Sequence, residues 1–213
     1  MKSIFKSNFI SLGILLGLSL VIVTITSHYI LTVKFFDDSE AYFSGIPGQE
    51  ANVYASLQKY IYLTTVAYIL VKLLITALVL YTALYLADKF IPFGKALHIA
   101  ILSEFIFLLQ AVLKIAWFNY RYPHGTLMDW HSVYVLSALS ITGDVSADWY
   151  YPLQTLNVFE IAYWFLLALG IRKATSLNYD QSLRLILASY VPLLFIWVVT
   201  VTFCTVMVFP GKA

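Results

Sequence analysis

Long apolar stretches alternate with short polar segments along the 213 residues. A helix that crosses the hydrocarbon core of a bilayer needs about 20 consecutive, mainly apolar residues. Five stretches come near or exceed that length, and each predicts a transmembrane helix. Their approximate ranges are 9–31, 60–86, 96–118, 156–171 and 183–208. The pattern therefore predicts an all-α fold, a polytopic membrane helix bundle in which residues 1–213 form a single integral membrane domain.

The first and last of these stretches carry further signals. Lys2 and Lys6 precede the first one, as they would in a signal peptide. Its apolar region is too long for a signal peptide, and no small-x-small cleavage site follows, so we expect a retained helix. Pro192 lies within the last stretch and predicts a kink, because proline lacks the amide hydrogen that a helix needs.

The segment between the third and fourth predicted spans, residues 127–141, contains an apolar run at 131–141 that is too short to cross. We expect it to form a short interfacial or re-entrant helix. Aromatic residues at headgroup level would flank it, as Trp and Tyr do at membrane interfaces. These residues are Trp130, Trp149, Tyr150 and Tyr151. A sixth, broken crossing is the main alternative topology.

Composition supports the membrane assignment. Hydrophobic residues make up 61% of the chain and charged residues 11%, whereas soluble domains carry about 25% charged residues. A chain this apolar could not cover a folded surface with polar groups in water. The net charge of +2 gives no sign of a nucleic-acid partner. The one cysteine, Cys204, cannot form an internal disulfide and is expected to be a small buried apolar residue.

The distribution of basic residues predicts an orientation. If the N-terminus is cytoplasmic, the inner segments carry seven basic residues and the outer segments four. The inner ones are Lys2, Lys6, Lys89, Lys95, Arg172, Lys173 and Arg184, and the outer ones are Lys34, Lys59, Arg121 and Lys212. Positive charge is enriched on the cytoplasmic side of membrane proteins. We therefore expect the N-terminus inside and the C-terminus outside.

Lys72, Glu104, Lys114 and Glu160 fall inside the predicted spans. An ionisable side chain costs about 2.5–3.5 kcal/mol at helix-centre depth. At a rise of about 1.5 Å per residue, Lys72 and Glu104 lie about 18 and 21 Å below the outer ends of their spans. Lys114 and Glu160 each lie about 6 Å inside the outer boundary. Equal depths on neighbouring helices predict two intramembrane charge pairs, Lys72–Glu104 and Lys114–Glu160.

Polar residues recur at helical spacing beside these lysines. Thr65, Tyr68 and Thr76 share a stripe with Lys72, and a similar line on the third span holds Ser103 and Gln110 with Lys114. Such stripes can hold a helix bundle together where the hydrophobic effect between helices is absent. They can also line an ion or proton path, or a polar substrate cavity. Both interpretations stay open from the sequence.

No motif points to catalysis. The chain contains no Walker phosphate loop, dinucleotide fingerprint, zinc-protease helix or Gly-x-Ser-x-Gly elbow, so neither an enzyme nor a cofactor is expected. In the outer loop, His124, Asp129 and His131 offer two imidazoles and a carboxylate to a metal. Their spacing matches no established metal signature, and we expect ordinary solvated loop residues there. That group would be the only basis for a membrane enzyme.

From Lys59 onward the chain resembles the Yip family of membrane-domain proteins, including its bacterial members. The resemblance rests on Phe-Gly-Lys-Ala-Leu at 93–97 between two long spans, on the span opening at 156–164 and ending in a Gly-basic turn at 168–175, and on the helix that follows at 181–183. The acidic tyrosine-proline motif of eukaryotic members is absent from this sequence. The resemblance implies a five-helix protein of the bacterial cytoplasmic (inner) membrane, with a Yip-like region at about 59–208 and no catalytic residues.

Two functions are compatible with these features. The leading hypothesis is a non-enzymatic scaffold or accessory subunit that contacts the lipid bilayer and either a membrane protein partner or further copies of itself. The outer segments 33–58 and 119–155 would then be partner surfaces. The alternative is a small transporter or channel component that uses Lys72, Glu104, Lys114 and Glu160.

Overall fold

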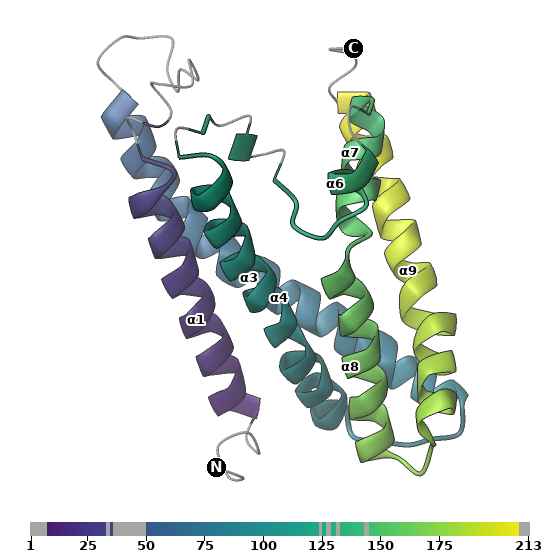
Figure 1. Ribbon diagram of the computed structural model, residues 1–213. Helices are drawn as coiled ribbons and strands as arrows, with labels where there is room; N and C mark the ends of the chain where they lie inside the picture. Colours follow the sequence, from purple (N-terminus) through teal and green to yellow (C-terminus); the bar gives the residue numbers. More distant parts are fainter. Residues whose placement is uncertain are drawn as a thin grey trace. The chain divides into compact units, whose positions relative to one another are not determined.

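The computed structural model (Figure 1) describes residues 8–32, 35, 50–123, 125–126, 129–130, 133–142 and 145–208. Within these residues the chain is helical, which confirms the predicted all-α class. The helices are α1 (Asn8–Tyr29), α3 (Glu50–Leu86), α4 (Phe93–Arg121), α6 (Leu139–Thr142), α7 (Ala147–Thr155), α8 (Val158–Ala174) and α9 (Tyr179–Val208). One isolated antiparallel bridge pairs Ser137 with Asn157.

Four of these helices are long and apolar enough to cross a membrane. They are Asn8–Tyr29, Gln58–Leu86, Phe93–Arg121 and Tyr179–Met207. These segments coincide with four of the five predicted spans, and they fit an integral membrane protein. The fifth predicted span corresponds to α8, which has 17 residues. At about 1.5 Å per residue, α8 is about 26 Å long, somewhat less than the roughly 30 Å hydrocarbon core.

The chain folds into two compact units, which are described separately. Unit 1 comprises residues 1–72 and 107–133, and unit 2 comprises residues 73–106 and 134–213. The division passes through α3 and α4, so that each of these two helices contributes one part to each unit. Helix α1 belongs to unit 1, and α6, α7, α8 and α9 belong to unit 2.

In unit 1, α1 buries a face on which two serines flank one leucine. Ser11, Leu15 and Ser19 recur every four residues and are nearly inaccessible. The Ser19 hydroxyl donates to the Leu15 carbonyl at 2.8 Å, which satisfies it without water. One turn further on, the Thr24 hydroxyl lies 3.4 Å from the Tyr62 hydroxyl of α3. Small side chains allow helix backbones to approach closely, the usual way in which membrane helices pack.

In unit 2, α8 and α9 form an antiparallel pair joined by residues 175–178, and α7 packs against the same helix α9 (Figure 1). The apolar core of unit 2 includes Leu80, Leu84, Ala96, Ala100, Leu167, Ile171 and Ile186. Gly170 lies directly against Ile99 of α4, where an added Cβ would overlap the isoleucine side chain. The glycine therefore sets how closely α8 approaches α4 within this unit.

The loop between α4 and α8 differs from the sequence prediction. We expected a short helix at 131–141, but residues 133–138 form turns and the bridge to Asn157, and only the single turn α6 follows. The longer helix is α7, in the segment that the sequence suggested was a set of aromatic anchors. Asp148 in its first turn favours the helix N-terminus electrostatically. Pro152 inside the helix obscured this signal, because an internal proline usually argues against a helix.

Two further details differ. Helix α3 begins at Glu50, about ten residues before the predicted span, so part of the expected outer segment 33–58 is helical. The prediction that Cys204 is buried is wrong, because the thiol is exposed on α9. The last turns of α9, from Phe203 to Met207, expose their side chains, as expected for a helix end that faces lipid.

Candidate functional site: a buried carboxylate–tyrosine cluster

Six polar side chains from four helices meet inside unit 2. This carboxylate–tyrosine cluster consists of Thr76 on α3, Glu104 on α4, Glu160, Tyr163 and Trp164 on α8, and Tyr190 on α9. All of these residues except Trp164 are less than a tenth exposed. Two of them, Glu104 and Glu160, are members of the charge pairs predicted from the sequence.

Glu160 lies in the first turn of α8, and its position follows from the way the helix begins. Asn157 is the N-cap residue, and its side-chain oxygen accepts a 2.8 Å hydrogen bond from the Glu160 amide. The Glu160 carboxylate oxygen Oε1 accepts from the Trp164 indole at 3.0 Å and from the Tyr190 hydroxyl at 3.1 Å. Trp164 is one turn further along α8, so it shares a face with Glu160. The carboxylate thus links α8 to α9.

Tyr163 joins the rest of the cluster. Its side chain is completely buried, and its hydroxyl lies 3.5 Å from Thr76 Oγ1. It interacts electrostatically with the carboxylates of both Glu104 and Glu160. Its ring also packs against Tyr190, with centroids 5.5 Å apart and planes tilted by 59°. Tyr163 therefore joins α8 to α3 through Thr76 and to α9 through Tyr190, close to both acidic residues.

The chemistry available to this set is hydrogen bonding and the exchange of protons or cations. Carboxylates and phenols both accept hydrogen bonds, and each can also carry a proton. Inside a bilayer such groups are retained only where they are satisfied by the protein or serve a function. Here Oε1 of Glu160 receives two donors from within the same unit. This arrangement fixes the relative positions of α8 and α9.

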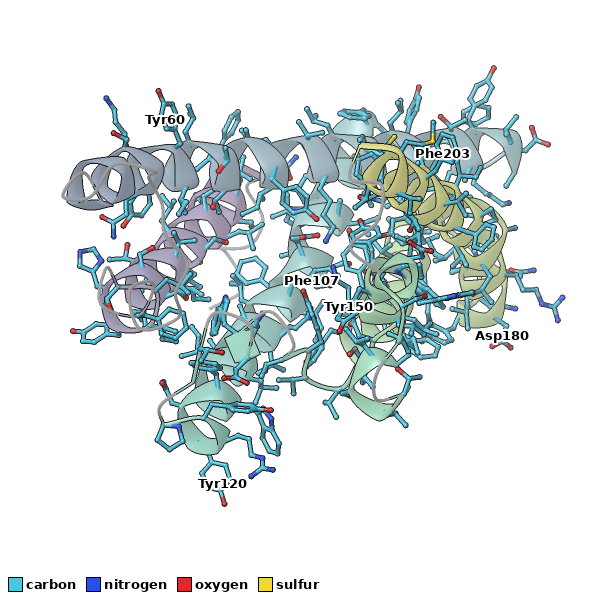
Figure 2. All side chains as sticks on the ribbon, turned by 90° about the horizontal axis from the view of Figure 1, so that it is seen from above. Tyr60, Phe107, Tyr120, Tyr150, Asp180 and Phe203 are labelled. Carbon is cyan, nitrogen blue, oxygen red and sulfur yellow. The ribbon has the colours of Figure 1, made fainter. Side chains whose placement is uncertain are left out.

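The two predicted lysines lie in unit 1, and aromatic rings face both. The Lys72 ammonium lies 3.5 Å from the ring centroid of Phe107, which is labelled in Figure 2. The Lys114 ammonium lies 4.4 Å from the Trp130 ring centroid. Trp130 in turn packs edge-on against Phe118, with centroids 5.1 Å apart. A cation over an aromatic face gains roughly 0.5–2 kcal/mol.

The predicted charge pairs remain predictions. Lys72 and Lys114 belong to unit 1, whereas Glu104 and Glu160 belong to unit 2. The structure assigns to each lysine an aromatic contact, and to Glu160 two hydrogen-bond donors. Depth alone could match the members of each pair, but it could not identify these aromatic and hydroxyl neighbours.

The predicted polar stripes fall into different environments. Thr65 donates to the Ile61 carbonyl of its own helix at 2.8 Å. Tyr68 is 63% exposed, whereas Thr76 is buried in the carboxylate–tyrosine cluster. On α4, Ser103 is buried and Gln110 is half-buried. The stripe on α3 is thus not one continuous buried face.

The outer-loop metal candidate is only partly within the described residues. Asp129 accepts hydrogen bonds from the Thr126 amide at 2.7 Å and from its hydroxyl at 2.9 Å, which closes a short turn. His124 and His131 lie outside the described residues. Among the residues that the structure does describe, no three His, Cys, Asp or Glu side chains gather as a metal site would require.

Sequence reasoning missed three members of the cluster, Tyr163, Trp164 and Tyr190, and the N-cap residue Asn157 that positions Glu160. Tyr163 and Trp164 follow Glu160 by three and four residues, so helical spacing could have placed them on its face. Asn157 could have been found as the polar residue just before an apolar run. For Tyr190 there was no comparable signal, because its contact depends on how α8 and α9 align.

The chain was compared with known proteins on three levels. No protein-family model, no curated protein and no solved structure matches it. The resemblance to the Yip family therefore stays an expectation from the sequence, and the functional assignment rests on the geometry described above.

Proposed function

We propose that this protein is a non-enzymatic integral membrane protein that acts as a scaffold or accessory subunit of a membrane complex. This proposal is supported by the hydrogen bonds that Glu160 and Tyr163 make within unit 2. Glu160 accepts from Trp164 and Tyr190, and Tyr163 is hydrogen-bonded to Thr76. Groups bonded in this way lock neighbouring helices together, as interhelical polar contacts do in membrane proteins.

We further propose five crossings, with α8 as the fifth and a re-entrant or interfacial segment before it. The N-terminus lies in the cytoplasm and the C-terminus outside, following the excess of basic residues in the inner segments. By resemblance to bacterial Yip-family proteins, the membrane is the bacterial inner membrane. Reporter fusions at the two ends test this topology, because an odd number of crossings places them on opposite sides. Two ends on the same side would contradict it.

The outer face of α9 supports an assembly role. Several of its large apolar side chains are more than half exposed: Phe195, Ile196, Val199, Phe203 and Met207. In a bilayer this face meets lipid or the helix of a neighbouring subunit. Because the exposed side chains of this face are apolar, a partner here would associate through side-chain packing.

Photo-crosslinking in native membranes tests the scaffold proposal. A photoreactive amino acid in place of Phe195 or Phe203 is expected to give one discrete adduct with a partner protein or a second copy. The same substitution at Leu166, an exposed residue on α8, is the matched control for non-specific capture. If all three positions label only lipid and the purified protein is monomeric, the scaffold proposal fails.

A second candidate, a small transporter or channel component, is favoured by one observation. Glu104 and Glu160 are both more than nine-tenths buried in unit 2, and Tyr163 interacts with both. Buried acidic side chains within spans commonly mark ion or proton paths. Under this function, Glu104→Gln abolishes a proton flux measured with a pH-sensitive dye in proteoliposomes while expression and unfolding temperature stay near those of the parent. Ser103→Ala, at the adjacent buried position, is the control.

A further inference from the structure

Helices α7 and α8 lie end to end along α9 (Figure 1). Helix α7 has nine residues and α8 has 17, and only Leu156 and Asn157 separate them. Residues 147–174 together correspond to about 42 Å of helix, close to the roughly 45 Å of the 30-residue helix α9. The break between α7 and α8 therefore falls along the length of α9, not beyond its end.

The depth of this break can be estimated from the basic residues at the other end of the helix pair. Arg172 is fifteen residues from Asn157, or about 23 Å along α8. If Arg172 and Arg184 mark the inner boundary, the break lies about 7 Å below the outer edge of a 30 Å core. Trp197 lies at a similar depth, about 10 Å below the outer edge, because it is about 20 Å along α9 from Arg184. Asp148 near the start of α7 then reaches headgroup level.

Protein groups supply several hydrogen bonds to the backbone at the break. The Ala138 amide donates to the Leu156 carbonyl at 2.9 Å, and the Val158 amide donates to the Leu136 carbonyl at 3.0 Å. Asn157 donates through its side-chain amide to the carbonyls of residues 154 and 155, at 3.0 and 3.1 Å. Irregular backbone is tolerated at membrane depth only where the protein supplies such partners.

Polar side chains near the break are also hydrogen-bonded within the protein. The Trp197 indole of α9 donates a 2.9 Å hydrogen bond to the Tyr151 hydroxyl of α7, so these two polar atoms satisfy each other. In contrast, Leu136, Leu156 and Val158 are each more than half exposed. Apolar side chains displayed around a break whose segments are hydrogen-bonded to each other are suited to contact with hydrocarbon.

We propose that α7 and α8 form one interrupted transmembrane span, and that residues 134–142 re-enter the outer half of the bilayer to pair with the break. The partner of Leu136, Leu156 and Val158 is then the lipid acyl chains of the outer leaflet. This inference rests on the proposed five-span topology. It also accounts for the shortness of α8, since the span is completed by α7.

Site-directed spin labelling tests this placement. The exposed Cys204 is first replaced by alanine. A nitroxide is then attached in liposomes to Leu136→Cys or Leu156→Cys, and its collisions with oxygen and with a water-soluble nickel complex are measured. Leu166→Cys on the exposed face of α8 is the lipid-facing control, and Asp148→Cys is the headgroup control.

We expect frequent collisions with oxygen and a loss of collisions with nickel at Leu136 and Leu156, as at Leu166. Frequent nickel collisions, as at Asp148, would place the segment in water and overturn the proposal. Few collisions with either reagent would mean that protein covers the segment, which overturns it as well. Reporter fusions at the two chain ends test the five-span topology independently. If they place the ends on opposite sides while the labels at the break collide with nickel, the topology stands and only the placement of the break is overturned.

Discussion

The Tyr190 hydroxyl on α9 and the Trp164 indole on α8 donate to the same oxygen of Glu160, at 3.1 and 3.0 Å. One buried carboxylate thus receives a donor from its own helix and a donor from the next. Because hydrogen bonds to charged or buried groups are expensive to leave unmade, this oxygen fixes the register between the two helices. The register in turn determines where the break between α7 and α8 lies along α9.

Removal of the Tyr190 hydroxyl should destabilise unit 2. We expect Tyr190→Phe to lower the free energy of unfolding by about 1–2 kcal/mol, because the ring remains but a donor to a buried carboxylate is lost. Tyr85→Phe, at an exposed position on α3, should have little effect. Thermal unfolding in detergent measures both changes.

A double-mutant cycle checks that this loss comes from the contact itself. If Tyr190 acts through Glu160, the effects of Tyr190→Phe and Glu160→Gln are non-additive, because each variant alters the same hydrogen bond. Additive losses would show that the two side chains act independently, contrary to the geometry.

Substitution of the N-cap residue should weaken the start of α8. Asn157→Ala removes the acceptor for the Glu160 amide and two donors to backbone carbonyls. A typical loss of an N-cap is about 1 kcal/mol, and the two further hydrogen bonds should raise the total to about 2–3 kcal/mol. Asn157→Asp keeps the cap acceptor and should recover part of the stability. Equal unfolding temperatures for the two variants would contradict a role for the side-chain oxygen as the cap acceptor.

The glycines of this chain should differ sharply in their tolerance of alanine. Gly170→Ala places a Cβ against Ile99 and should cost about 1–3 kcal/mol, the usual range for overpacking. Gly17→Ala on α1 meets open space and should be neutral or slightly stabilising, because alanine favours helices. Unfolding in detergent distinguishes the two. A tolerated Gly170→Ala would mean that α8 and α4 can separate without loss.

The environment of Lys72 can be tested through its aromatic neighbour. Phe107→Leu keeps an apolar side chain but removes the ring face beneath the ammonium, and the lost cation–π contact should cost about 0.5–2 kcal/mol. In a Lys72→Met background the same change should cost less, since the cation is gone. Stability is measured for all four combinations. Equal costs in both backgrounds would exclude a cation–π contribution.

A parallel cycle of Lys72→Met with Glu104→Gln tests the predicted ion pair. If the two residues are paired, the single variants leave an uncompensated charge and the double variant regains much of the stability. Independent losses would point instead to separate roles for the lysine and the buried acid.

The helices were predictable from the sequence because an apolar run long enough to cross a bilayer is an unambiguous pattern. All five predicted spans correspond to helices, and the two buried acidic residues were recognised from the cost of placing charge in hydrocarbon. Helix α7 was missed, because Trp149, Tyr150 and Pro152 within nine residues resemble an interfacial loop. Its helical state depends on packing against α9, which no local pattern encodes.

The partners of the charged residues were also beyond a sequence prediction. Depth along a helix gives one coordinate only, so it matches Glu160 with Lys114 but does not identify the hydroxyl and indole donors that Glu160 receives. Which face each helix turns toward its neighbours depends on small residues such as Gly170 and on side-chain shape. Tyr190 reaches Glu160 across thirty residues of sequence through such packing.

Helix α3 has 37 residues, which at about 1.5 Å per residue amounts to about 55 Å. Its apolar part, Gln58–Leu86, accounts for 29 of them, so its first eight residues add about 12 Å of continuous helix before the span begins. Because the helical backbone leaves the bilayer without a break, a tilt of the span also tilts the eight residues that precede it. A protein attached to the beginning of α3 would therefore be held at a set height above the lipid, and a change in membrane thickness would move it.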